Sequence, residues 1–390
     1  MYGSVSNLEK FASCAYSYFL RYGLKLKERD VLEFDSIKLG NMLHEAVDEF
    51  WKRIKDDGRR WQEYTEEETG ELAETVFSDI EKKYTDMGFF ENDDEQFRLS
   101  MIKDLYVHTV ETLGFHLRQG LFDVADTEYK LESDIELSNG KKMHYKGSAD
   151  RIDVYEKGGD LYLKVLDLKS YNNKLSLDDV YYGLQLQLLV YLHEAMESET
   201  KKRGKTPRFG GVFYYDMEDP VVDAPETADD VAYDEADDGA AGEEETEFTA
   251  EELETIDENI KKKHKLSGIH TDNIDVIKAI DMGFGNKGLV LKGSITKDNK
   301  LNQHTKALSD EDFKVVDDFV MGKVKELGDR IMSGEMDKNP YYKAKKSSCE
   351  FCDYKNICDF DRDDGDDYRW LNNMKDPQAL DAMKNKGDIS

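Results

Sequence analysis

GSADRIDVYEKGGDLYLKVLDLK, residues 147–169, contains two strand-like runs joined by a glycine-rich turn. Because side chains alternate between the two faces of a strand, Asp167 and Lys169 share one face. Asp150 lies on the partner strand of the predicted hairpin. We therefore predict that this stretch brings two carboxylates and one ammonium group to a single place on a sheet.

The rest of the chain predicts an α/β (α+β) protein in which a mostly helical part precedes a sheet. The predicted helices cover residues 4–22, 37–56, 62–84, 94–118, 177–196 and 309–333. The predicted strands cover residues 128–137, 142–156, 160–168 and 208–216, and a hairpin is expected near residues 289–295. Ser6, with Glu9 three residues later, is the expected N-cap of the first helix.

These elements and the local composition divide the chain into five parts. Residues 1–122 form a helical part that carries Cys14 and His44, and residues 123–216 hold the core sheet and its helix. Residues 217–258 are an acidic, low-complexity insert that we expect to be disordered. The last two parts are residues 259–362, with Cys349, Cys352 and Cys358, and a charged tail over residues 363–390.

The net charge of −31 counts against nucleic-acid binding, because domains that bind DNA usually carry a basic footprint. The charge is uneven, since the segment from Asp216 to Glu258 contains 20 acidic residues and no Lys or Arg. Small basic groups occur elsewhere, within residues 21–29, 261–265 and 343–346. Each of these groups is typical of a solvated surface.

The composition indicates a protein with a real core, because 39% of the residues are hydrophobic and 11% are aromatic. No stretch reaches the roughly 18 apolar residues that a membrane helix needs. The N-terminus lacks the basic-then-apolar pattern of a signal peptide. We therefore expect a soluble, cytoplasmic protein with no membrane partner.

The predicted carboxylate–lysine group suits phosphodiester hydrolysis. Mg²⁺ prefers carboxylate and water oxygens, and it can polarise a phosphate and lower the pKa of a bound water. A lysine beside the metal can orient the attacking water or neutralise developing charge. The alternative is an exposed Asp-x-Lys on an edge strand, where it would form a surface ion pair. The apolar run over residues 161–168 favours a central strand instead.

Two helical features belong to the same hypothesis. Gln187 and Tyr191 lie four residues apart on the helix after the Asp-x-Lys strand, so they share a helix face. His44 follows Gly40 by one turn on the second predicted helix. The alternatives are a core glutamine satisfied by backbone groups and a histidine that only packs.

The order of these motifs resembles the PD-(D/E)xK nucleases of the RecB type. The motifs are Leu-Gly-x-x-x-His, Gly-x-x-Asp, Asp-x-Lys and Gln-x-x-x-Tyr, at His44, Asp150, Asp167–Lys169 and Gln187–Tyr191. Longer segments, among them SVSNLEKFASCAYSYFLRYGLKLKER and CEFCDYKNICDFD, resemble the C-terminal nuclease region of the AddB family, one of the two components of AddAB helicase–nucleases. The resemblance covers nearly the whole chain except the acidic insert and the extreme tail.

The resemblance implies a restriction-endonuclease-like core, with a mixed central sheet flanked by helices. It implies that Asp150 and Asp167 bind Mg²⁺ (or Mn²⁺) and that Lys169 is the catalytic lysine. His44 would be a further metal ligand or its positioner. Gln187 and Tyr191 would support the site and contact DNA. An upstream family glutamate matches Glu128 loosely, and the usual Gly-Arg-Ile-Asp reads Gly-Ser-Ala-Asp, from which we expect tuning rather than loss.

The four cysteines predict a metal site. Cys349, Cys352 and Cys358 form a three-ligand cluster, and Cys14 is the only possible fourth ligand. Thiolates hold either Zn²⁺ or an iron–sulfur centre, and the spacing does not decide between them. The AddB resemblance implies a [4Fe–4S] cluster with a structural role, which would clasp the C-terminus to the N-terminus. Such a clasp stabilises by an amount on the order of several kcal/mol.

The leading hypothesis is a metal-dependent DNA exonuclease domain that processes double-strand ends for recombinational repair. In the family the strand of 5′ polarity is cut, and AddA is the motor. This chain has no Gly-x4-Gly-Lys-Ser/Thr phosphate loop, so we expect the motor to be a partner. Because Met1 lies so close to the first motif, we expect an excised domain or a truncated gene.

Two alternatives stay open. One is a stand-alone RecB-type nuclease similar to the nucleases of CRISPR adaptation, which share the cysteine layout. The other is a non-catalytic iron–sulfur module that binds DNA. That module would need a broken Asp-x-Lys motif, and the motif is intact here.

Overall fold

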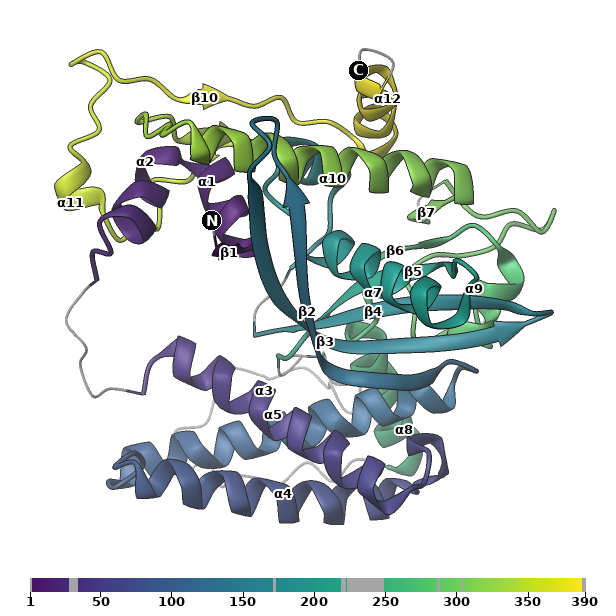
Figure 1. Cartoon of the computed structure of the whole chain (residues 1–390). Helices are drawn as coiled ribbons and strands as arrows, with labels where there is room; N and C mark the ends of the chain where they lie inside the picture. Colours follow the sequence, from purple (N-terminus) through teal and green to yellow (C-terminus); the bar gives the residue numbers. More distant parts are fainter. Residues whose placement is uncertain are drawn as a thin grey trace, which may run out of the picture.

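A computed structural model describes residues 2–27, 34–170, 173–218, 222, 249–285, 288–303 and 305–387. These residues fold around a mixed, seven-stranded sheet flanked by helices (Figure 1), which confirms the predicted fold class. The strand order is β1 (Tyr2–Ser4), β3 (Lys142–Lys157), β4 (Asp160–Lys169), β5 (Arg208–Asp216), β6 (Ser267–Thr271) and β7 (Ala307–Leu308), with β2 (Asp123–Glu136) paired to β3.

The centre of the sheet is formed by β4 and β5. Strand β4 pairs antiparallel with β3 and parallel with β5, and β5 pairs antiparallel with β6. Nearly every residue of β4 and β5 is buried, because helices cover both faces of the sheet. The Asp-x-Lys strand is therefore central, as its apolar run predicts.

One face of the sheet is covered by α3 (Ser36–Asp57), α4 (Glu66–Asp86) and α5 (Asp93–Arg118), at the bottom of Figure 1. Side-chain caps from Asp35, Thr65 and Asn92 begin these helices. A buried stripe of α3 packs with β4 and β5 residues in one core: Met42, Leu43, Ala46, Val47 and Phe50. Helices α8 (Ala250–Lys263) and α9 (Ile274–Ile280) follow in the chain.

The other face is covered by α1 (Val5–Ser13), α6 (Leu177–Tyr182), α7 (Gln187–Arg203), α10 (Asp310–Met332) and α12 (Asp376–Gly387). Alternate residues of the same strands, including Leu163, Val165 and Val212, pack against these helices. The protein thus has three layers, with the sheet between two groups of helices (Figure 1).

Two expected helices and one expected N-cap differ from the structure. The helix over residues 4–22 breaks at Cys14, whose extended backbone separates α1 from α2 (Ala15–Tyr18) and the π-helical turn Phe19–Gly23. Its N-cap is Ser4, which accepts from Asn7, and not Ser6. The helix over residues 177–196 is split at Gly183, which adopts a left-handed conformation, into α6 and α7.

The C-terminal half also departs from expectation. The described residues near 289–295 form no hairpin; they contribute isolated bridges from Leu291 to Leu266 and from Ile295 to Leu301. Most of the acidic insert lies outside the described residues, but residues 250–258 belong to α8. The expected charged tail contains β10 (Arg369–Trp370) and α12, which buries Ala379 and Met383.

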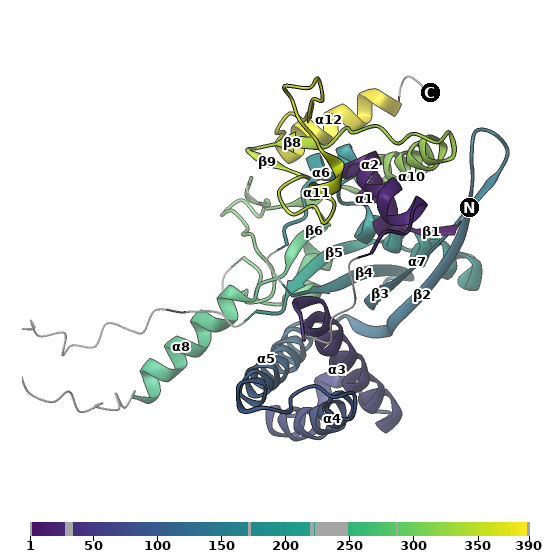
Figure 2. The same cartoon turned by 90° about the vertical axis from the view of Figure 1, so that its left-hand side faces the viewer.

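A second, small sheet lies beside α1 and α2. It consists of β10, β8 (Tyr341–Lys343) and β9 (Lys346–Ser347), and α11 (Lys355–Cys358) follows it. Figure 2 shows this C-terminal segment next to the N-terminal helices. The two ends of the chain therefore meet on one side of the molecule. No helix in the described ranges is long and apolar enough to cross a bilayer.

Candidate active site

The three residues of the predicted carboxylate–lysine group meet at the end of β4. The Lys169 ammonium lies 2.5 Å from Asp167 Oδ2, and Asp167 is almost fully buried. The β3–β4 ladder ends at the pair Arg151–Leu166, and beyond it the Asp150 carboxylate accepts a 2.6 Å hydrogen bond from the Leu168 amide. A side chain thus replaces a strand partner and holds Asp150 beside the Asp-x-Lys pair.

His44 reaches the same place from α3. Its Nδ1 lies 3.5 Å from Asp150 Oδ1. Burial acts to lower the pKa of His44, but the contacts with Asp150 and the charge of Asp167 raise it above its ordinary value. The helix therefore adds an imidazole nitrogen to a group of carboxylate oxygens.

Glu128 completes the cluster from β2. It faces Asp150 across the β2–β3 pair, between the partners Thr127–Arg151 and Tyr129–Ala149. Its φ is +43°, a left-handed conformation that is uncommon for a residue other than glycine. Ser148 donates a 2.8 Å hydrogen bond to Glu128 Oε2. The left-handed backbone of Glu128 and the hydrogen bond from Ser148 therefore keep this carboxylate at the site.

The donor set fits a divalent cation. Ligand atoms of His44, Glu128 and Asp150 all lie within 4.8 Å of one another, and one imidazole nitrogen with two carboxylate oxygens suits Mg²⁺ or Mn²⁺. The sequence grouped His44 and Asp150 with Asp167; the structure groups them with Glu128, while Asp167 pairs with Lys169. The charge of Asp150 still acts on Asp167, as the pKa of Asp167 shows.

The carboxylates are crowded and short of positive charge. Burial, followed by the charge of Asp150, raises the pKa of Asp167 to about 6, although Lys169 opposes the shift. Burial, with the charges of Asp150 and Asp48, also raises the pKa of Glu128 against its bond from Ser148. Carboxylates that resist ionisation in this way are stabilised when a cation binds.

Gln187 and Tyr191 lie together, as their spacing predicts. Gln187 is the first residue of α7, and its Nε2 donates a 3.0 Å hydrogen bond to the Tyr191 hydroxyl. The Tyr191 ring lies against Gly147 of β3, where a Cβ atom would come within 2.5 Å of Tyr191 Cε1. This close approach explains the glycine of the Gly-x-x-Asp motif.

Glu9 is a site neighbour whose position the sequence does not reveal. Its spacing from Ser6 indicates a capping box, but its carboxylate accepts hydrogen bonds from the Leu186 and Gln187 amides at 2.6 and 2.9 Å. Nothing in the local sequence could have found this contact, because Glu9 and α7 are far apart in the chain.

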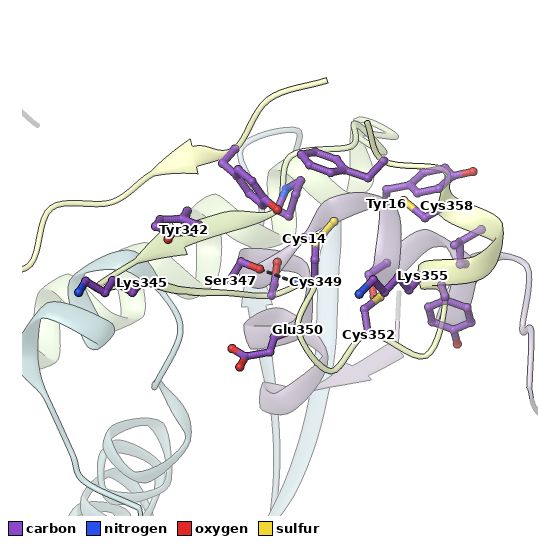
Figure 3. A pocket seen from close by; sticks show the side chains of 17 residues that line it. Cys14, Tyr16, Tyr342, Lys345, Ser347, Cys349, Glu350, Cys352, Lys355 and Cys358 are labelled. Carbon is purple, nitrogen blue, oxygen red and sulfur yellow. Dashed lines mark hydrogen bonds between the residues drawn. The ribbon is translucent and has the colours of Figure 1, made fainter. Parts of the chain in front are cut away.

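The four cysteines line one cavity of about 320 Å³ between α1–α2 and the C-terminal segment. Figure 3 shows Cys14, Cys349, Cys352 and Cys358 around it. All four are free thiols, and Cys14 is buried. Burial, then the charges of the other three cysteines, raises the pKa of Cys349 to about 11. Thiolates that line one cavity are ligands of the kind that Zn²⁺ or an iron–sulfur cluster takes, and the positive charge of such a group would keep them ionised.

A mixed sheet that presents an Asp-x-Lys strand beside further carboxylates defines a class of metal-dependent nucleases. Residues 3–359 match the PD-(D/E)XK nuclease superfamily, and the chain belongs to that superfamily.

The chain is also similar to curated proteins that are named as the B component of an ATP-dependent helicase/deoxyribonuclease. It is 32% identical to the one from Alkaliphilus metalliredigens (strain QYMF) over 98% of this chain and 32% of that protein. It is 30% identical to the one from Clostridioides difficile (strain 630) over 99% of this chain and 32% of that protein. These relatives confirm the resemblance to AddB, and the chain spans about a third of their length.

Proposed function

We propose that this chain is a DNA exonuclease domain that hydrolyses phosphodiester bonds with a divalent cation. The observation that carries the proposal is the meeting of His44, Glu128 and Asp150 next to the Asp167–Lys169 pair. Three carboxylates, one imidazole and one ammonium converge there from α3, β2, β3 and β4. A purely structural ion pair would need no such excess of acids.

The metal ligands in this proposal are His44, Glu128, Asp150 and Asp167. A bound Mg²⁺ (or Mn²⁺) supplies Lewis-acid chemistry, because it polarises a phosphate and lowers the pKa of a water. The protein holds the ligands ready: the Leu168 amide fixes Asp150, and the Ser148 hydroxyl fixes Glu128. The ligand geometry therefore does not depend on mobile side chains.

Lys169 is the proposed catalytic lysine. Burial opposes its charge, but Asp167 raises its pKa, so the ammonium group stays protonated at neutral pH. A fixed ammonium can orient the attacking water and offset the charge that develops on the phosphate. Gln187 and Tyr191 flank this position and are proposed to contact the DNA strand.

We further propose that Cys14, Cys349, Cys352 and Cys358 hold a [4Fe–4S] cluster. The support is one cavity lined by all four thiols and the sequence resemblance to AddB. Its role would be to fasten the C-terminal segment to α1 and α2. A Zn²⁺ site is the competing assignment, and an absorption spectrum with iron and zinc analysis of anaerobically purified protein separates the two.

The biological setting is a helicase–nuclease that processes double-strand DNA ends for recombinational repair. The relatives are named as helicase/deoxyribonuclease components, which supports an AddA-type partner in the bacterial cytosol. Such a partner would deliver one unwound strand, of 5′ polarity by family resemblance, to the site. Delivery by a partner also suits the net charge of −31, which disfavours unaided DNA binding.

The test is degradation of end-labelled linear DNA by the anaerobically purified chain, with and without Mg²⁺. Lys169→Ala should remove the activity, while Lys201→Ala, which changes an exposed lysine of α7, should not. Activity that is the same in all three proteins would contradict the site. If none of them is active, repeating the assay with an AddA-type partner distinguishes a partner-dependent nuclease from a binding module.

A further inference from the structure

Helix α7 begins with a cap that comes from a distant part of the chain. Its own N-cap residue is Leu186, which has no side chain that can accept a hydrogen bond. Instead the Leu186 and Gln187 amides both donate to Oε1 of Glu9, at 2.6 and 2.9 Å. The carboxylate thus does for α7 what a local Ser or Asp does for most helices.

The capped turn is the one that presents the Gln187–Tyr191 pair. Gln187 is both the residue whose amide Glu9 holds and the residue whose side chain bonds the Tyr191 hydroxyl. The Tyr191 ring in turn lies against Gly147, three residues before Asp150. A displacement of the first turn of α7 would therefore move side chains that flank the candidate active site.

The setting of Glu9 is unusual for a carboxylate. Burial raises the pKa of Glu9 to about 7, although the two amides and the charge of Lys169 act against the rise. Glu9 in turn adds to the charges that raise the pKa of Lys169. A buried carboxylate costs stability, and a polar residue at position 186 could have capped the helix locally. The costlier arrangement makes the start of α7 depend on α1.

We propose that Glu9 is a positioning residue: its carboxylate, contributed by α1, fixes the first turn of α7 and thereby the Gln187–Tyr191 pair beside the catalytic strand. This inference rests on the proposed nuclease function. It assigns to α1 a role in the active site in addition to its place next to Cys14.

Two substitutions separate position from charge. Glu9→Gln keeps a carbonyl oxygen that can accept both amides but removes the charge. Glu9→Asp keeps the charge but withdraws the acceptor by one methylene group. The matched control is Glu197→Ala, which removes an exposed carboxylate of α7. The assays are kcat and KM for DNA hydrolysis at saturating Mg²⁺, and hydrogen exchange at the Leu186 and Gln187 amides.

A positioning role predicts that Glu9→Gln keeps most of the wild-type kcat and the slow exchange of both amides. Glu9→Asp should lose kcat by about tenfold, with little change in KM and with faster exchange. Glu197→Ala should change neither quantity. Thermal unfolding of each protein checks that the folded chain is being compared.

Two results would overturn the assignment. If Glu9→Asp is active and Glu9→Gln is not, the charge of Glu9 matters rather than its position. If both retain wild-type kcat, Glu9 is structural only. These results differ from a failure of the proposed function, in which the unsubstituted chain shows no Mg²⁺-dependent cleavage that Lys169→Ala abolishes; the role of Glu9 then falls with it.

Discussion

Two charged clusters are neighbours along β3 and β4, and Arg151 of one lines the same pocket as His44, Glu128 and Asp150 of the other. Their composition is reversed. In the candidate active site, several carboxylates share the single ammonium of Lys169, and the Lys169 side chain is 25% exposed. In the neighbouring cluster, Arg151 and Lys164 share the single carboxylate of Asp153, and all three side chains are at most 5% exposed.

The difference teaches which cluster can accept a ligand. Asp153 Oδ2 lies 2.8 Å from Arg151 Nη2 and 2.9 Å from Lys164 Nζ, and the cations also lie over the rings of Trp51 and Phe122. In the buried cluster each cation thus has the Asp153 carboxylate and an aromatic ring as neighbours. The active-site cluster has too few cations for its acids and opens to solvent, so a cation from outside would offset its excess negative charge. Substitutions and pH changes should therefore affect the two clusters differently.

The largest expected effect is the loss of nuclease activity in Lys169→Ala. The substitution removes the ammonium group that we propose to face the reacting phosphate, so the rate should fall by roughly a thousandfold or more. The melting temperature should change little, because Lys169 is partly exposed. Initial rates on labelled DNA and thermal unfolding measure the two quantities. An active Lys169→Ala protein would remove the distinction between the clusters.

Asp153→Ala should have the largest effect on stability. It leaves Arg151 and Lys164 buried without a counter-charge, which costs about 3–5 kcal/mol. Urea unfolding gives the change in the free energy of unfolding, and Lys201→Ala provides an exposed control. A loss below about 1 kcal/mol would mean that water or rearrangement satisfies the two cations.

Gly147→Ala should impair the site without touching a charged group. Its Cβ would lie 2.5 Å from Tyr191 Cε1, so the Tyr191 ring must move. We expect kcat to fall by about tenfold, because displaced side chains next to reacting groups cost rate. The matched control is Gly140→Ala in the β2–β3 turn, where a Cβ meets nothing within 4 Å, although its positive φ costs some stability. Equal kcat in both proteins would contradict a role for the Tyr191 contact.

The smallest expected effect is a pH dependence of metal affinity. The pKa of Asp167 is raised to about 6, so a proton competes with the cation below that pH. The apparent Mg²⁺ affinity should fall by about twofold at pH 6 and about fourfold at pH 5.5, relative to pH 7.5. The raised pKa of His44 adds to the loss. Mg²⁺ titrations of initial rate at each pH measure it, and a flat profile would contradict metal binding by Asp167.

The stability that the buried cluster contributes should depend on pH only in the acidic range, below the ordinary pKa of an aspartate. Burial acts to raise the pKa of Asp153, but Arg151 and Lys164 hold it below the ordinary value of 3.8. A lowered pKa stabilises the fold above 3.8, and that stability is lost only as the pH falls through the folded-state value. Stability measured between pH 7.5 and 5.5 should therefore show no pH-dependent contribution from Asp153.

The sequence could predict those parts of this molecule that depend on local pattern. Three such features depend only on residues that are close in the sequence. They are the strand alternation at Asp167 and Lys169, the apolar stripe of α3, and the helical spacing of Gln187 and Tyr191. Arg151-x-Asp153 and Asp167-x-Lys169 each place one acidic and one basic residue two positions apart in a strand. The sequence therefore cannot tell the buried ion cluster from the solvent-accessible one, and only the fold distinguishes them.

The features that the sequence could not predict come from distant contacts. The first helix breaks at Cys14 where Ala15 donates its amide to Asn339 Oδ1, 324 residues away. The left-handed backbone of Glu128 is set by its place opposite Asp150 on β3. The cap of α7 by Glu9 joins two helices that share no local signal. Each of these depends on tertiary structure rather than on spacing.

The cavity of the four cysteines also has a consequence for how the molecule is made. Within this chain Cys14 leaves the ribosome early, while Cys349, Cys352 and Cys358 follow more than 300 residues later. The cavity walls also include Tyr16 and Tyr368, so neither end of the chain can form it alone. During synthesis Cys14 therefore remains without the other three cysteines until the C-terminal segment has been made. Loading of the proposed cluster would therefore mark a chain that has been translated through Cys358, and a product that ends before Cys349 would hold only one of the four thiols.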